Sequence, residues 1–224
     1  GFVLYAKTDV LVWTLPLSTY IFFSLTSAGL AFVSSIPVVF GLKRYEAIEK
    51  RALYLEIAVL IGSFVCLILH LGSPLAVIYI FLSPNPSSPL WWLAVLYHVY
   101  FVLLVSAFWA IHKGKISKPL GVIIFLIAIG TSTTLGWLLG MTDARPTLNA
   151  SFFSVYFPLT GFTSGLGALV LASMVYAHLS GQEVTEDRNA LYNDLARIMG
   201  IMAGMVLVLF LWRTISGGRS STAV

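Results

Sequence analysis

Charged residues are scarce in this sequence, and their scarcity argues against a water-soluble fold. Only 10% of the 224 residues are Asp, Glu, Lys or Arg, whereas 58% are hydrophobic and the mean hydropathy is +0.93. A soluble globular domain has about a quarter of its residues charged. Several apolar runs reach the roughly 20 residues that cross a hydrocarbon core of about 30 Å. The sequence therefore predicts an all-α polytopic membrane protein, surrounded by lipid bilayer and without a nucleic-acid partner.

Cysteine is almost absent, which limits redox chemistry within the chain. Cys66 stands alone, so the chain cannot form an internal disulfide or ligate an iron–sulfur cluster by itself. The sequence contains no HExxH, Walker A, GxSxG or HxE…CxxC motif. A bis-histidine haem needs two histidines at similar depth on neighbouring helices, and only the pairing of His70 with His98 stays open. We predict no metal or haem in this chain.

Apolar runs between charged or proline-rich breaks predict a helical bundle of about six transmembrane helices. They form a single transmembrane domain over 1–224, with helices at about 10–40, 52–71, 90–111, 120–141, 152–179 and 198–215. Two GxxxG pairs, Gly161 with Gly165 and Gly200 with Gly204, provide small residues for close helix packing. We interpret them as packing within one bundle rather than as a dimer interface.

Basic residues alternate between the loops and predict the orientation. The first and third loops are basic, and the second has no charge; the basic positions are Lys43, Arg44, Lys50, Arg51, Lys113, Lys115 and Lys118. Cytoplasmic loops of membrane proteins carry an excess of Lys and Arg. The odd loops are therefore expected in the cytoplasm, and both termini outside.

The uncharged second loop, HLGSPLAVIYIFLSPNPSSPLWW from His70 to Trp92, holds four of the nine prolines. Proline restricts the backbone, so a rigid outer cap is expected. Ser88 and Pro89 suit the N-cap and first position of the third helix. The run LAVIYIFL is too short to cross a membrane, and it either lies at the outer interface or extends the second helix.

A few ionisable residues lie within the predicted spans, where charge is costly and often functional, and two of them, Glu56 and His98, are the candidates for such a role. Glu56 is expected about one turn inside the second helix, and His98 about two turns inside the third, beside Tyr97 and Tyr100. A proton path through Glu56 and His98 is one interpretation. The alternatives are an interfacial carboxylate paired with Lys50 or Arg51, and a histidine that only packs or contacts a ligand.

Aromatic and polar residues gather at the predicted outer surface, where they suggest a quinone site. A quinone needs an apolar slot for its ring, hydrogen bonds for its carbonyls and groups that exchange protons. The candidate quinone-binding residues are Trp13, Tyr20, His70, Trp137, Asp143 and Arg145. Any one of the tryptophans is equally well explained by the aromatic belt of a membrane protein.

Three segments follow one another along the chain: WTLPLSTYIFFSLTSAGLAFVSS, LGSPLAVIYIFLSPNPSSPLWW and DARPTLNASFFSVYFPLTGFTSGLGAL. In this order they resemble the NrfD/PsrC family of membrane subunits, in which the second segment reads "DLGRP…NPxSPMSW" and the third "RPxWN…F…SG". The family's Asp, Arg and Trp in these segments are His70, Ser73 and Leu148 here. Because these three residues differ from the family pattern, they bear on the quinone site and on contacts with partners. Family members also usually have eight or more helices, whereas about six are predicted here.

The resemblance implies a metal-free membrane anchor of a respiratory complex in a prokaryotic cytoplasmic (inner) membrane. Such a subunit binds menaquinone or ubiquinone near the outer face. It exchanges electrons with a ferredoxin-like iron–sulfur subunit there, which connects to a molybdopterin-type catalytic subunit. Proton translocation is a further expectation. The alternatives are a small transporter or permease without a redox role, a haem-b anchor, and a structural anchor whose quinone pocket has been lost.

Overall fold

The computed structural model describes residues 14–71, 75, 77–114, 116–141, 150–181 and 185–220, and for 150 and 216–220 only the backbone. The long helices are α1 (Leu15–Phe40), α2 (Glu46–His70), α4 (Pro89–His112), α5 (Lys118–Gly140), α6 (Ala150–Ser180) and α7 (Glu186–Ser220). A 3₁₀ turn, η1 (Lys43–Tyr45), and a short helix, α3 (Val77–Leu82), complete the described elements. Six of these helices are long and apolar enough to cross a membrane, which confirms the predicted helical bundle.

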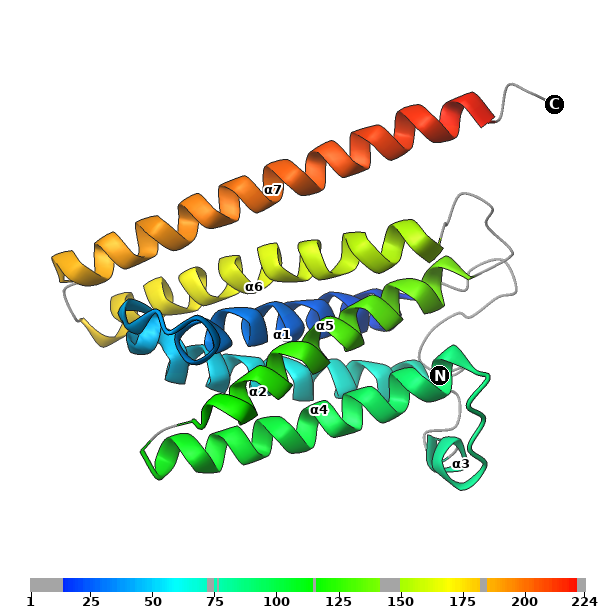
Figure 1. Ribbon diagram of the computed structural model, residues 1–224, viewed down its shortest axis with the longest axis horizontal. Helices are drawn as coiled ribbons and strands as arrows, with labels where there is room; N and C mark the ends of the chain where they lie inside the picture. The colour runs from blue at the N-terminus through cyan, green and yellow to red at the C-terminus, as the bar shows by residue number, and fades with distance from the viewer. Residues whose placement is uncertain are drawn as a thin grey trace.

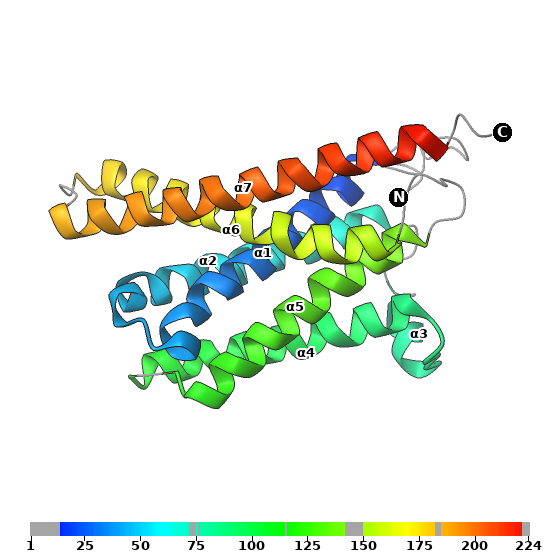
Figure 2. The same ribbon diagram turned by 45° about the horizontal axis from the view of Figure 1, so that its top comes forward.

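The long helices run side by side and alternate in direction (Figure 1). α1 begins, and α7 ends, at the end of the bundle that carries α3 (Figures 1 and 2). At the opposite end lie η1 and the basic residues Lys50, Lys113 and Lys118. We call these the uncharged end, after the loop between α2 and α4 that has no Asp, Glu, Lys or Arg, and the basic end of the bundle. Arg213, near the end of α7, also lies at the uncharged end, against the Phe152 ring.

α1 is the central helix, because its small side chains let three neighbours approach. It packs against α2, α5 and α6, and most of its middle is buried. A Cβ atom on Gly29 would overlap the carbonyl of Gly161, and one on Gly165 would overlap the backbone of Gly29. The GxxxG pair of α6 therefore forms a backbone contact with α1. The second pair, Gly200 and Gly204, has no atom of the described chain within 4 Å of a Cβ position.

Two helices begin six or more residues earlier than the apolar runs indicate. α2 begins at Glu46 rather than 52, and α7 begins at Glu186 rather than 198. The first turns of α7 are held by packing instead of by lipid: Leu191, Tyr192 and Leu195 are buried in a core cluster at the basic end. Arg44 pairs with Asp194 at 2.6 Å, and Arg51 donates to the Tyr192 hydroxyl at 3.2 Å.

The loop between α2 and α4 is partly helical, since the run after residue 75 forms α3 as a separate short helix. α4 begins with Pro89 at its first position, after an extended Ser88 whose side chain makes no capping hydrogen bond. Trp92 Nε1 donates to the Pro86 carbonyl at 2.8 Å, which ties the proline-rich turn to α4. α3 is thereby held beside the uncharged end of the bundle.

Candidate functional site

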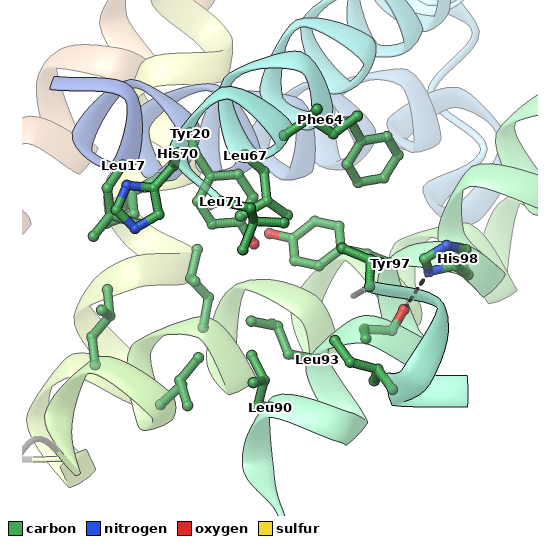
Figure 3. Close-up of a pocket in the computed structure, with 18 residues that line it drawn as sticks. Leu17, Tyr20, Phe64, Leu67, His70, Leu71, Leu90, Leu93, Tyr97 and His98 are labelled. Atoms are coloured by element: carbon green, nitrogen blue, oxygen red, sulfur yellow. Dashed lines mark hydrogen bonds between the residues drawn. The ribbon is translucent and has the colours of Figure 1, made fainter. Parts of the chain in front are cut away.

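A cavity of about 460 Å³ lies between α1, α2, α3, α4 and α5 at the uncharged end of the bundle (Figure 3). Its volume falls within the range of small-molecule pockets. Leu17, Leu67, Leu93 and Leu135 are among its apolar walls. None of the described residues that line it is Asp, Glu, Lys or Arg. The cavity therefore suits a flat apolar molecule with a few hydrogen-bonding atoms.

Two tyrosines supply hydroxyl groups at the buried end of the cavity. Tyr20 on α1 and Tyr97 on α4 are 6% and 3% exposed. Their hydroxyls point toward one another in Figure 3. The Tyr97 hydroxyl is fully buried and has no hydrogen-bond partner among the described residues. A buried donor without a partner costs about 1–3 kcal/mol, so a ligand atom that accepted from Tyr97 would recover that energy.

Two histidines line the same cavity, on opposite sides in the view of Figure 3. His70, at the end of α2, lies with Nδ1 2.8 Å from the Thr14 hydroxyl. His98 on α4 has Nδ1 2.7 Å from the Ala94 carbonyl. A carbonyl only accepts, so Nδ1 of His98 carries the proton, and its Nε2 is an acceptor in the neutral ring.

A buried carboxyl group lies deeper in the bundle, away from the cavity. Glu56 is 0% exposed. The Tyr100 hydroxyl donates to its Oε1 at 2.7 Å, and the Ser34 hydroxyl to its Oε2 at 3.0 Å. Because α2 begins at Glu46, Glu56 lies about three turns (~15 Å) inside the helix rather than one turn. The alternative of an interfacial carboxylate paired with Lys50 or Arg51 is therefore wrong.

Hydroxyl groups continue from Glu56 toward the cavity. The Tyr100 hydroxyl also lies 3.1 Å from the Ser27 carbonyl. The hydroxyls of Ser24 and Ser63 lie 2.6 Å apart, and Ser63 also donates to the Tyr20 carbonyl at 3.3 Å. We call this set the polar column; its members are Tyr20, Ser24, Ser27 and Ser34 of α1, Glu56 and Ser63 of α2, and Tyr97 and Tyr100 of α4.

The polar column follows from helical periodicity. Its α1 members are spaced three, four or seven residues apart, and so are those of α2 and α4, which places each set on one helix face. From Tyr20 to Ser34 the column extends about 21 Å along α1. It therefore spans much of the roughly 30 Å hydrocarbon thickness.

The structure brings together some of the predicted site residues and separates others. Tyr20 and His70 both line the cavity. His98 lines the cavity as well, but its described partners are Ala94 and aromatic rings, not members of the polar column. Trp137 is 40% exposed and lies outside the cavity lining. Trp13, Asp143 and Arg145 lie outside the described residues.

Sequence reasoning missed Tyr97 and Tyr100 as site residues. In the sequence they stand out only as neighbours of His98, but in the structure both tyrosines are buried and His98 is exposed. The available signal was their spacing, since Leu93, Tyr97, Tyr100 and Leu104 recur at intervals of three or four and form the buried face of α4.

Metal-ligating residues do not cluster in the described part of the chain. No group of three or more His, Cys, Asp or Glu side chains there is placed to hold a metal ion. The chemistry that the described site offers is hydrogen bonding and proton exchange by tyrosine, histidine, serine and one carboxyl group.

Comparisons with known proteins identify a family for the chain. The family model described as "Polysulphide reductase, NrfD" matches residues 4–224. The chain is similar to a selenate reductase subunit of Mesobacillus selenatarsenatis, with 28% identity over 118 residues, 53% of this chain and 28% of that protein. It is also similar to the Hdr-like menaquinol oxidoreductase integral membrane subunit of Archaeoglobus fulgidus, with 26% identity over 199 residues, 85% of this chain and 47% of that protein.

The chain thus spans less than half the length of the curated relatives it matches. The match to the family model nevertheless extends over nearly the whole chain, and it confirms the resemblance carried by the three sequence segments. This integral membrane protein belongs to the NrfD family.

Proposed function

We propose that this protein is a quinone- or quinol-binding membrane subunit of a respiratory oxidoreductase complex. The observation that carries the proposal is the apolar cavity at the uncharged end, with the buried hydroxyls of Tyr20 and Tyr97 at its closed end. Membership of the NrfD family supports it. The name of the Archaeoglobus relative, a menaquinol oxidoreductase membrane subunit, favours menaquinone over ubiquinone as the ligand.

The residues of the cavity divide the work of a quinone site. The leucines exclude water and hold the ring, and the Tyr97 hydroxyl donates to one carbonyl oxygen. Tyr20 lies beside Tyr97 and can exchange a proton near the same oxygen, and His70 exchanges protons near the other oxygen. A quinol bound there would supply two electrons and two protons. Trp13, Asp143 and Arg145 complete the site in the proposal, and Trp137 contributes to the aromatic belt around it.

The partners in this proposal lie outside the chain. A ferredoxin-like iron–sulfur subunit docks at the uncharged end and exchanges electrons with the quinone, and a molybdopterin-type catalytic subunit lies beyond it. Both relatives are subunits of reductase or oxidoreductase systems by name, which supports such an assembly. The membrane is the cytoplasmic membrane of a prokaryote, with the uncharged end and both termini outside.

The polar column is proposed as a proton path between the cavity and the basic end. Glu56 with Tyr100 and Ser34 forms its inner section, and Ser24 with Ser63 its outer section. The chain of hydroxyl groups supports Glu56 in this role. His98 has no described contact with the column, so we assign it to the cavity and not to the path.

The test is quinol oxidation by the assembled complex, with menaquinol as donor. We expect the His70→Ala/Asp143→Ala double variant to lose at least tenfold in turnover while the subunits still co-purify in mild detergent. A matched control is Tyr54→Phe, because Tyr54 contacts His112 at the basic end and does not line the cavity. Full activity of the double variant would refute the assignment of the site.

A haem-bearing anchor is the second candidate, and one observation favours it: His70 and His98 line the same cavity. An optical spectrum of the purified subunit decides between the two functions. A Soret band that disappears in both His70→Ala and His98→Ala would establish the haem.

A further inference from the structure

The cavity has a closed end and an open side. Its lining residues Tyr20, Tyr97, Leu93 and Leu135 are buried. By contrast, Ile68 on α2 is 49% exposed, Leu90 on α4 is 50% exposed, and His98 is also exposed. The open side therefore lies between α2 and α4.

The surface around this open side is apolar. Ile61 and Val65 precede Ile68 on the same exposed part of α2, and Val102 lies one turn after His98 on α4. These side chains are between 47% and 62% exposed, as expected for positions in contact with hydrocarbon. The cavity consequently opens onto an apolar surface of the bundle, as expected for a face in contact with lipid.

Three aromatic rings border the opening on its inner side. Phe64 of α2 lies 6.4 Å from the His98 ring of α4, and Phe81 of α3 meets the same ring edge-on at 4.6 Å. We call Phe64, His98 and Phe81 the aromatic row. Val77 and Ile80 of α3 line the cavity next to this row. Ala94, one turn before His98, lines the cavity within the gap and adds almost no bulk there.

We propose that the isoprenoid tail of the bound quinone leaves the cavity sideways into the bilayer, between Ile68 and Ala94, outward of the aromatic row. The inference rests on the proposed quinone function and adds the route of the tail. A long isoprenoid tail is entirely apolar and too large for a cavity of about 460 Å³ that also holds the ring. An exit into hydrocarbon keeps the tail out of water and leaves one ring oxygen facing Tyr97.

The experiment compares two ligands that differ only in the tail. Menadione is the naphthoquinone ring without a tail, and menaquinone carries a long one. Retention of each labelled ligand is measured with the full chain in lipid nanodiscs, for the wild type, Ala94→Trp and Ala94→Leu. We expect Ala94→Trp to weaken menaquinone binding at least tenfold and menadione binding less than threefold. Ala94→Leu should show the same preference to a smaller degree.

The control is Val102→Trp, an equally large residue on the exposed face of α4 but outside the cavity. It should bind both ligands as the wild type does. Equal weakening of the two ligands by Ala94→Trp, or no discrimination by Ala94→Leu, overturns the tail route and leaves the quinone function standing. If the wild type retains neither ligand, the proposed function falls and the tail route with it.

Discussion

Tyr97 and Tyr100 lie one turn apart on the same face of α4, yet the structure gives them different tasks. The Tyr97 hydroxyl is buried at the cavity without a described partner, whereas the Tyr100 hydroxyl donates to Glu56. A buried hydroxyl without a described partner does not stabilise the ligand-free chain. A hydroxyl that satisfies a buried carboxyl group stabilises the fold.

Replacing each tyrosine by phenylalanine separates these tasks. Tyr97→Phe should weaken menaquinone binding about tenfold, the value of one hydrogen bond of roughly 1.4 kcal/mol. It should not lower the free energy of unfolding of the ligand-free chain, and should raise it by up to about 1–3 kcal/mol, because an unpartnered buried hydroxyl is removed. Tyr100→Phe removes the donor to Glu56 and should lower the free energy of unfolding by about 1–3 kcal/mol. Ligand retention and thermal unfolding of both variants in the same detergent check the pair. A Tyr97→Phe protein with wild-type affinity would contradict the assignment of Tyr97.

Glu56 allows a similar separation of structure from proton transfer. In Glu56→Gln the amide keeps the shape, and Ser34 can direct its proton to the Ala31 carbonyl, 3.2 Å away, and accept from the amide. We expect Glu56→Gln to change the free energy of unfolding by no more than about 1 kcal/mol. Glu56→Ala removes the carboxyl group that accepts from Tyr100 and Ser34 and leaves a cavity, so it should lower the free energy of unfolding by about 2–4 kcal/mol.

The functional measurement on Glu56→Gln uses the assembled complex in closed vesicles. Quinol oxidation should continue, and any proton transfer linked to the basic side should stop, because an amide does not titrate. Unchanged proton transfer at normal turnover would exclude Glu56 from the path.

At the scale of helices, the contact between α1 and α6 depends on glycine at three positions. A Cβ on Gly29 would overlap the Gly161 carbonyl, and the two helices cannot separate without loosening the buried side chains on both sides. Gly29→Ala should therefore destabilise the protein by about 1–3 kcal/mol, as overpacking does elsewhere.

The same substitution at Gly200 provides the matched control. No described atom lies within 4 Å of its Cβ position, and alanine favours a helix by up to about 1 kcal/mol over glycine. Gly200→Ala should be neutral or stabilising in thermal unfolding of the purified protein. Equal destabilisation by Gly29→Ala and Gly200→Ala would contradict the described contact between α1 and α6.

Hydropathy predicted the six spans, because crossing a membrane is mainly a matter of apolar length. It did not predict the start of α7, whose first turns contain Glu186, Asp187 and Asp194 and become helical through packing of Leu191 and Leu195.

The residues of the candidate site could be predicted only in part, for a related reason. Tyr20 and His70 stood out by their expected depth, but the roles of Tyr97, Tyr100 and Ser63 depend on which helix faces meet, and that is a property of the packed bundle.

For the whole molecule, the charge distribution between its two ends argues for one orientation. The basic end carries Lys43, Arg44, Lys50, Arg51, Lys113 and Lys118, and the stretch from residue 71 to 92 at the other end has no charge. Lys and Arg near spans are retained on the cytoplasmic side. The basic end should therefore face the cytoplasm, which places the cavity, α3 and the proposed electron-transfer partner outside.

Cysteine labelling tests this orientation with little disturbance, since Cys66 is the one cysteine of this sequence. In a Cys66→Ser background, Ser83→Cys lies at the exposed end of α3 and Lys113→Cys at the basic end of α4. A membrane-impermeant maleimide added to intact cells should label Ser83→Cys, and it should reach Lys113→Cys only after permeabilisation. The reverse pattern would place the cavity on the cytoplasmic side. An outer iron–sulfur partner would then be unable to reach the quinone, and the direction assigned to the polar column would be inverted.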